Sequence, residues 1–195
     1  MTVTPHAERE MQAAQLVVPV TERDHTLGPA KAAVTLVEYG DFECPHCRRA
    51  HPLIQRVLRQ MGDALRFVFR HFPLAEAHPH ARHAAEMAEA AAAQGKFWEM
   101  HDILFENQDA LEDKDLLTYA ANVGIDVERA YKELTAGTYT RKVRDDFRGG
   151  VRSGVNGTPT FFINGYRFDG NWSDIREFVQ ALTEAANQAP AGAPG

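Results

Sequence analysis

The amino-acid sequence predicts an α/β fold that runs β-α-β, then through a block of helices, and ends β-β-α. Three observations support this prediction. Apolar and β-branched residues form strand-like runs at 34–39 and 65–72, and a segment with helical spacing lies between them. The stretch from 79 to 151 has a helical pattern. Asn164-Gly165 is a hairpin signal between two further apolar runs.

The first half of the chain is expected to supply an N-terminal extension, two strands and one long helix. The long helix has Ile54, Val57 and Met61 on one apolar face, and Gly62-Asp63 ends it. The expected elements are, in order, a polar helix near residues 7–15, an edge strand near 16–20, a strand at 34–39, the helix at 45–61 and a strand at 65–72.

The second half is expected to be mostly helical before it returns to the sheet. Ala84, Met87 and Ala91 lie on one apolar stripe, and a second stripe follows at 97–105. The further elements are helices near 115–122, 127–134 and 141–151, strands at 160–163 and 166–168, and a last helix at 173–186.

Composition and charge exclude several classes of protein. The chain has 195 residues, 44% of them hydrophobic, and a net charge of −6. The negative charge opposes binding to nucleic acid or anionic lipid, so neither partner is expected. No run reaches the ~18 apolar residues of a membrane span. Because residues 1–30 contain no apolar signal segment, we expect a cytoplasmic protein, or a periplasmic or otherwise extracytoplasmic one if a signal peptide has been removed.

The two cysteines form a Cys-Pro-His-Cys motif at the predicted start of a helix. Unpaired N–H groups and the positive end of the helix dipole favour a thiolate there. Cysteines in such motifs have pKa values of ~3.5–7.5 instead of ~8.5. Pro45 suits the first turn because it has no N–H to leave unsatisfied, and His46 can add N–H donation or positive charge. Cys44 is therefore expected to attack a disulfide, and Cys47 to resolve the mixed disulfide.

The cysteine pair has three other interpretations. A zinc site needs histidines to complete it, because there is no second cysteine pair. Two inert structural cysteines need no chemistry at all. A c-type haem site needs a histidine directly after the second cysteine, where this chain has Arg48. No dinucleotide-binding glycine pattern is present, so we expect no bound flavin or nicotinamide and no cofactor besides the Cys44–Cys47 disulfide.

These residues resemble the DsbA-like branch of the thioredoxin superfamily, whose oxidase member has the same Cys-Pro-His-Cys motif. The resemblance extends over residues 24–186. Glu38 corresponds to the buried acid of the family, and Pro52 to the proline that bends the active-site helix. Thr158-Pro159 looks like the cis-proline loop of the family.

The resemblance implies a thioredoxin fold with a helical insertion domain. On this basis the chain divides into an N-terminal extension at 1–25, a thioredoxin-fold domain at 26–75 and 155–187, a helical insertion at 76–154, and a disordered tail at 188–195.

The resemblance also implies roles for three residues outside the motif. Thr158 and Pro159 would bind the substrate backbone as an added strand; the alternative is an ordinary trans proline that begins a strand. Burial would raise the pKa of Glu38 and let it relay a proton near Cys47. The alternative for Glu38 is an acid that faces solvent at a strand end.

Four histidines need separate interpretation. His78, His80 and His83 are close in sequence, but they stand at a predicted helix start, where solvated residues are common, so no metal site is expected. His101 shares an apolar stripe with Phe97 and is expected to be a hydrogen-bonded core histidine.

The expected function is thiol–disulfide exchange on protein or small-molecule disulfides and dithiols. Its partners would be thiol proteins or glutathione, together with a redox partner that the sequence does not identify. The direction stays open between oxidase, reductase and isomerase, because a low Cys44 pKa makes a site oxidising, whereas Thr158 before the proline resembles the isomerase and reductase branches. The alternative function is a thioredoxin-fold binding or regulatory module without thiol turnover.

Overall fold

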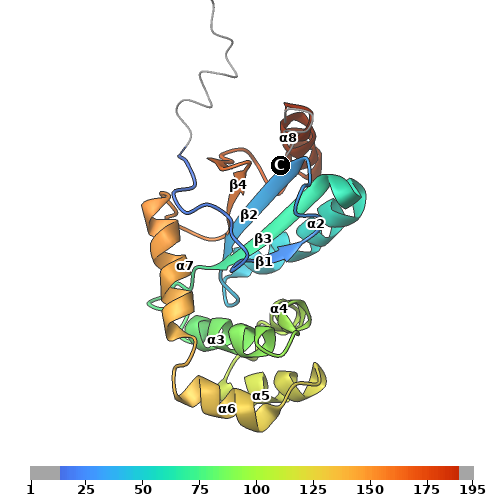
Figure 1. The fold of residues 1–195 in the computed structure, drawn as a ribbon. Helices are drawn as coiled ribbons and strands as arrows, with labels where there is room; N and C mark the ends of the chain where they lie inside the picture. Colours follow the sequence, from blue (N-terminus) through green and yellow to red (C-terminus); the bar gives the residue numbers. More distant parts are fainter. Residues whose placement is uncertain (1–13, 189–195) are drawn as a thin grey trace, which may run out of the picture.

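The structure, a computed structural model, describes residues 14–188, which form one five-stranded mixed sheet and seven α-helices (Figure 1). The sheet has the order β1-β3-β2-β4-β5. The strands are β1 (His25–Leu27), β2 (Val34–Gly40), β3 (Leu65–His71), β4 (Thr160–Ile163) and β5 (Tyr166–Arg167). The helices are α2 (Pro45–Met61), α3 (Ala81–Ala92), α4 (Phe97–Glu106), α5 (Asp113–Asn122), α6 (Val127–Thr135), α7 (Thr140–Arg152) and α8 (Ile175–Gln188), with a short 3₁₀ turn η1 (Gly62–Ala64).

The central strand β2 is hydrogen-bonded on both sides. It pairs in parallel with β3, to which α2 connects it, and antiparallel with β4. Val34, Leu36 and Val37 are buried, as expected for a central strand covered on both faces. The register places Glu38 between Phe69 of β3 and Phe161 of β4. The carboxyl end of β2 therefore delivers the chain directly to the loop before Cys44.

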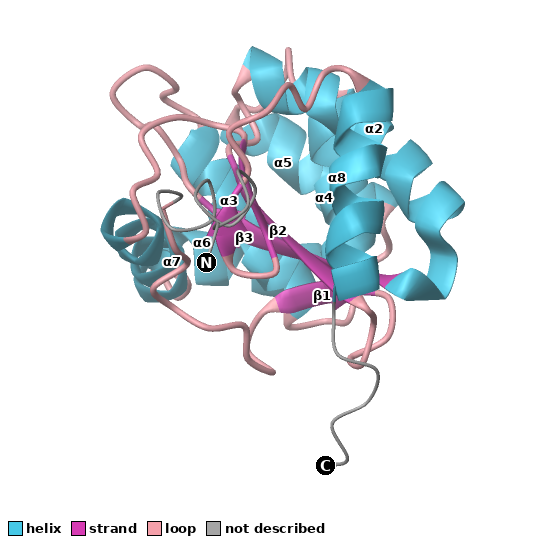
Figure 2. Cartoon of the chain, turned by 90° about the horizontal axis from the view of Figure 1, so that it is seen from above, coloured by secondary structure: helices cyan, strands magenta, loops and turns pink. Residues whose placement is uncertain are grey.

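Helices cover both faces of the sheet. Figure 2 shows α7 on one side and α2 and α8 on the other. On the α2 side, Ile54 and Val57 belong to one core with Leu36 and Phe178, and on the α7 side Val37 and Phe147 belong to a second. This arrangement and the block α3 to α6 between β3 and α7 confirm a thioredoxin fold with a helical insertion (Figure 1).

The N-terminal segment differs from the prediction. The expected edge strand at 16–20 is absent; instead Gln15 forms an isolated bridge with Tyr166, and the edge strand is β1, which pairs with β3. Pro19 has no N–H to donate to a ladder, and the carbonyl groups of Val18 and Pro19 are used by Arg70. The predicted helix near 7–15 lies mainly outside the described residues, as does nearly all of the tail at 188–195, and Gln188 ends α8.

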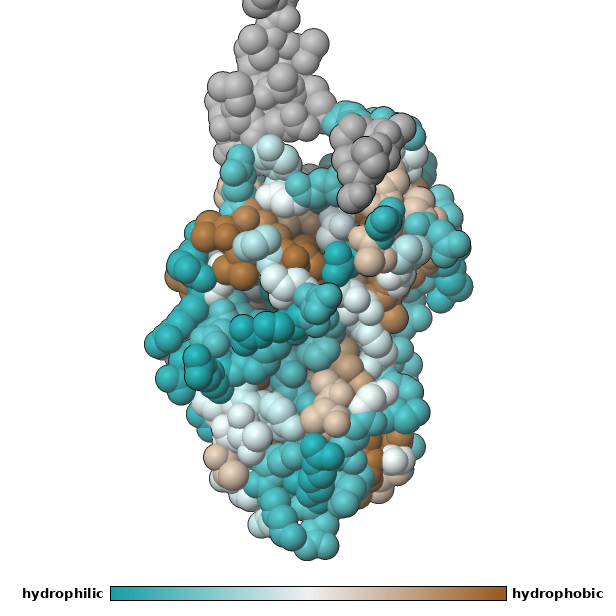
Figure 3. Space-filling view, in the orientation of Figure 1, coloured by the Kyte–Doolittle hydropathy of each residue, from teal (hydrophilic) through white to brown (hydrophobic). Residues whose placement is uncertain are grey.

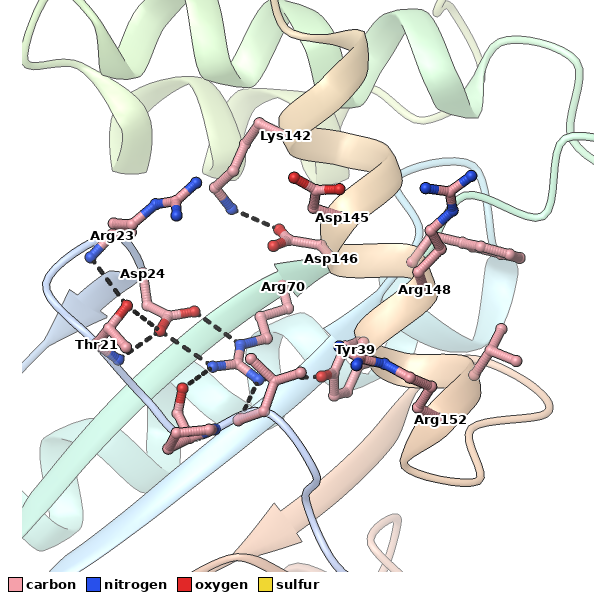
Figure 4. A pocket seen from close by; sticks show the side chains of 15 residues that line it. Thr21, Arg23, Asp24, Tyr39, Arg70, Lys142, Asp145, Asp146, Arg148 and Arg152 are labelled. Atoms are coloured by element: carbon pink, nitrogen blue, oxygen red, sulfur yellow. Dashed lines mark hydrogen bonds and ion pairs between the residues drawn. The ribbon is translucent and has the colours of Figure 1, made fainter.

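Arg70 of β3 attaches this segment to the sheet (Figure 4). Its guanidinium makes a two-point ion pair with Asp24, at 2.7 and 3.0 Å, and donates to the hydroxyl of Tyr39 at 3.0 Å. It also donates to the carbonyl groups of Val18 and Pro19. Because every donor of a buried arginine is satisfied, this group serves as a structural clamp.

The surface is polar over most of the insertion. Figure 3 shows hydrophobic residues gathered near the upper end of α7 and hydrophilic ones below. The exposed large hydrophobic residues include Val17 and Val151, which are 52% and 53% exposed. Within residues 14–188, none of the helices combines the length and apolarity that crossing a membrane requires.

Candidate active site

Cys44 is the N-cap residue of α2, and its side chain is buried. Its Sγ lies 3.3 Å from the carbonyl oxygen of Thr158. A hydrogen bond from the Cys47 thiol lowers the pKa of Cys44 to about 5, and the Thr158 side chain and the backbone N–H groups of Cys47 and His46 act in the same direction against the effect of burial. Cys44 is thus a thiolate at neutral pH.

Cys47 lies one turn further along α2 and is fully buried. The two cysteines are free and 4.0 Å apart. Burial raises the pKa of Cys47 well above 9, and the hydrogen bond to Cys44 and the charge of Glu38 add to this effect. The backbone N–H of Asp41 donates to Cys47 Sγ at 3.4 Å. The pair therefore combines a thiolate with a protonated thiol that points toward it.

Glu38 is buried in the sheet on the strand that leads to the cysteines. Burial, together with the negative charge of Cys44, raises its pKa to about 8. The acid is thus mostly protonated at neutral pH while Cys44 is a thiolate. The structure places Glu38 in the buried position that the sequence indicated, and its role in proton transfer stays a prediction.

The loop before β4 lies against Cys44. The Thr158–Pro159 peptide bond is cis, and the Thr158 carbonyl faces the sulfur. The Thr158 hydroxyl is buried and has no hydrogen-bond partner among residues 14–188, and the Thr158 side chain contributes to the low pKa of Cys44. This loop therefore forms a wall of the site beside the sulfur of Cys44.

The two residues between the cysteines are exposed. Pro45 occupies the first turn of α2, as expected. The ring of His46 is 2.6 Å from Arg49, so the donation to Cys44 comes from the His46 backbone N–H and not from its imidazole.

Three further residues shape the site, and the sequence analysis gave none of them a place in it. The fully buried carboxylate of Asp41 accepts hydrogen bonds from the N–H groups of Glu43 and Leu74, both at 2.8 Å, and lies 2.7 Å from His78 Nδ1. Although burial opposes it, Asp41 raises the pKa of His78, and the charge of Cys44 adds to the effect. Gln108 Nε2 donates to the carbonyl oxygens of Phe42 and Cys44.

The histidines near the site do not gather around the cysteines. His78, His80 and His83 pair with three different carboxylates, Asp41, Glu43 and Asp113. Within residues 14–188, neither cysteine belongs to a group of three or more converging metal-ligand side chains. The geometry therefore supplies no further ligands for a zinc site at the cysteine pair.

Comparison with known proteins identifies the family. The family model described as Thioredoxin matches residues 20–182. The chain belongs to the thioredoxin family. Among solved structures, the thioredoxin-like oxidoreductase of Silicibacter pomeroyi is 27% identical, with a TM-score of 0.72 over 84% of this chain and 94% of that chain. Oxidised BdbD of Bacillus subtilis is 24% identical, with a TM-score of 0.78 over 90% and 97%.

A curated relative of this thioredoxin-family chain has a different kind of name. The Na(+)/H(+) antiporter NhaA 1 of Salinispora arenicola is 45% identical over 178 residues, which cover 91% of this chain and 26% of the relative. The chain thus spans about a quarter of the length of the curated relatives it matches. The antiporter name describes the whole relative, and no antiporter activity follows from it for this chain.

Proposed function

We propose that this chain is a thiol–disulfide oxidoreductase that acts on protein or small-molecule disulfides and dithiols through Cys44 and Cys47. The observation that supports it most strongly is the difference between the pKa values of the two cysteines. The pKa of Cys44 is about 5, and that of Cys47 is raised well above 9. The Cys44 thiolate is therefore the nucleophile, and Cys47 stays a protonated thiol until the second exchange.

The proposed reduction of a substrate proceeds in two exchanges. The Cys44 thiolate attacks one sulfur of a substrate disulfide, forms a mixed disulfide and releases the other sulfur as a thiolate. Cys47 then loses its proton and attacks the Cys44 sulfur. This step forms the Cys44–Cys47 disulfide and releases the second substrate thiolate, so two electrons pass from the protein to the substrate. Oxidation of a dithiol is the reverse sequence.

Glu38 is the proposed acceptor of the Cys47 proton. The negative charge of Cys44 is one cause of the raised Glu38 pKa. When Cys44 enters a mixed disulfide this charge disappears, so the Glu38 pKa falls and its carboxylate becomes available at the moment when Cys47 must be deprotonated. The loop with Thr158 and Pro159 would hold the substrate backbone beside Cys44.

Direction and location belong to the proposal as well. A Cys44 pKa below ambient pH stabilises the reduced form, which favours a site that oxidises its substrates. Glutathione or a thiol protein would serve as the exchange partner. A cytoplasmic location stays a prediction.

Two serine variants test this function. Cys47→Ser keeps the nucleophile and should accumulate mixed disulfides, whereas Cys44→Ser keeps only the buried thiol and should neither turn over nor trap substrate. Reduced and non-reduced mass spectrometry after incubation with a disulfide-containing peptide measures both. Full turnover by Cys44→Ser would contradict the mechanism. A folded wild-type chain without any exchange would favour the binding or regulatory module.

A further inference from the structure

A second cluster of polar side chains lies between the active-site helix and the insertion. His51 is on α2, one turn after Cys47, and His101 and Asp102 are on α4. The two histidines are 9% and 6% exposed. Asp102 Oδ1 is 2.9 Å from His101 Nδ1 and 3.4 Å from His51 Nε2, and ligand atoms of all three side chains lie within 4.8 Å of one another.

A hydrogen bond between His101 and Asp102 accounts for only part of this convergence. His51 Nε2 is buried and has no hydrogen-bond partner among the described residues, although it points at Asp102. A buried polar atom without a partner is rare and costly. In a tetrahedral site with bonds of about 2.0–2.1 Å, neighbouring ligand atoms lie about 3.3–3.4 Å apart. The His51–Asp102 separation of 3.4 Å matches this spacing, whereas the 2.9 Å between His101 Nδ1 and Asp102 Oδ1 is hydrogen-bond distance.

The charge states of the three groups suit a cation. Burial lowers the pKa of His51 to about 4 and also lowers the pKa of His101, so both imidazoles are neutral, as metal binding requires. Although burial opposes it, His101 lowers the pKa of Asp102, which keeps the carboxylate ionised. Gln55 Nε2 donates to Asp102 Oδ2 at 3.2 Å, which leaves Oδ1 directed at the histidines.

The other histidine–carboxylate group has an ordinary explanation. His25 Nε2 and His71 Nε2 each lie 2.8 Å from Glu89 Oε1, which is hydrogen-bond distance. The ammonium group of Lys142 is 3.7 Å from the same oxygen, so a positive charge already occupies its surroundings. Hydrogen bonds and an ion pair account for this cluster without a metal ion.

We propose that His51, His101 and Asp102 form a binding site for a divalent transition-metal ion of the zinc type. Two imidazole nitrogens and one carboxylate oxygen are a ligand set that such ions accept, with water in the remaining position. The side chain of Asp102 is 39% exposed, which gives solvent and the ion a path of entry. A bound ion would join α2, the helix that bears both cysteines, to α4 of the insertion.

Zinc titration of the oxidised protein tests the site, because a Cys44–Cys47 disulfide removes both thiolates as competing ligands. Isothermal calorimetry should give one Zn²⁺ per chain. Asp102→Asn, a nearly isosteric change, and His51→Gln should each weaken binding by at least about 100-fold, because even outer-shell partners of metal ligands are worth about 10–100-fold. His25→Gln, in the other cluster, should bind like the wild type.

Cobalt provides a second readout that does not depend on stability. Co²⁺ should give the visible absorption of a tetrahedral site without a sulfur charge-transfer band, and circular dichroism should confirm that each variant is folded. The proposal is overturned if the oxidised wild type binds no Zn²⁺, or if folded Asp102→Asn and His51→Gln retain wild-type affinity. Loss of binding in His25→Gln alone would also overturn it.

Discussion

The side-chain amide of Gln108 donates a hydrogen bond of 2.9 Å to the carbonyl oxygen of Cys44. The same nitrogen donates to the carbonyl oxygen of Phe42 at 2.7 Å. Gln108 follows α4 in the insertion, so one buried amide from the insertion holds both sides of the loop that presents Cys44. The insertion therefore helps to build the candidate active site as well as to cover the sheet.

Replacing Gln108 should loosen this loop. Gln108→Ala leaves the Phe42 carbonyl without its donor, and the free energy of unfolding should fall by about 1–3 kcal/mol. Urea denaturation measures the change. Asn107→Ala is the matched control, because Asn107 is exposed and its side chain donates to the Ile103 carbonyl at the end of its own helix. Equal loss in both variants would show that the Gln108 amide has no special role.

The ionisation of Cys44 should be directly observable. The ultraviolet absorbance of its thiolate should titrate with a midpoint near pH 5, and Cys44→Ser should lack this transition. Because the folded pKa lies below the ordinary value of 9.0, the thiolate stabilises the reduced protein fully above pH 9. This stabilisation decreases as the pH falls and is lost below about 5. A midpoint near 9 would contradict the environment described for this sulfur.

Glu38 should destabilise the fold at neutral pH. Its pKa is raised from 4.5 to about 8, so unfolding releases its proton and stability declines as the pH rises from 4.5 to 8. Glu38→Gln removes this titration and should stabilise the protein on the order of 3 kcal/mol at pH 7, with no gain below pH 4.5. Urea denaturation across this pH range measures it, with exposed Glu106→Gln as the control. A pH-independent difference would argue against a titrating Glu38.

Removal of Asp24 should be costly. Asp24→Ala leaves the guanidinium of Arg70 buried without its counter-charge, and breaking a buried pair in this way costs about 3–5 kcal/mol. Glu128→Ala breaks the exposed pair with Lys132 and should cost about 0–1 kcal/mol. Thermal unfolding compares the two variants. Similar costs would mean that the Arg70 clamp does not hold the N-terminal segment.

Elements with strong local signals were predictable from the sequence. The predicted helix at 45–61 coincides with α2, because Pro45 begins it and Gly62 ends it. The strand at 160–163 coincides with β4, and Asn164 and Gly165 both have positive φ, as their turn requires. The cysteine motif was also predictable from local sequence, because its chemistry depends on the start of a helix and on the two-residue spacing of the cysteines.

Features that depend on long-range contacts were not predictable. Gln108 is 64 residues from Cys44 in sequence, and His78 is 37 residues from Asp41. β-Branched residues are frequent at 16–20, which favours the prediction of an edge strand there. The sequence gives no sign that Arg70 donates hydrogen bonds to the carbonyl groups of Val18 and Pro19. In each case the hydrogen-bond partner of a buried polar side chain is set by the folded arrangement of distant segments.

The reduction potential of the Cys44–Cys47 pair tests the central claim most directly. Equilibration in graded glutathione buffers, followed by thiol alkylation, should show one reversible two-electron transition. A Cys44 pKa of about 5 is about two units below that of thioredoxin, and this difference is worth about 60 mV. Added to the thioredoxin potential of about −270 mV, it places the potential of the Cys44–Cys47 pair at about −210 mV. If the two cysteines show no reversible two-electron transition, the chain is not a thiol–disulfide oxidoreductase.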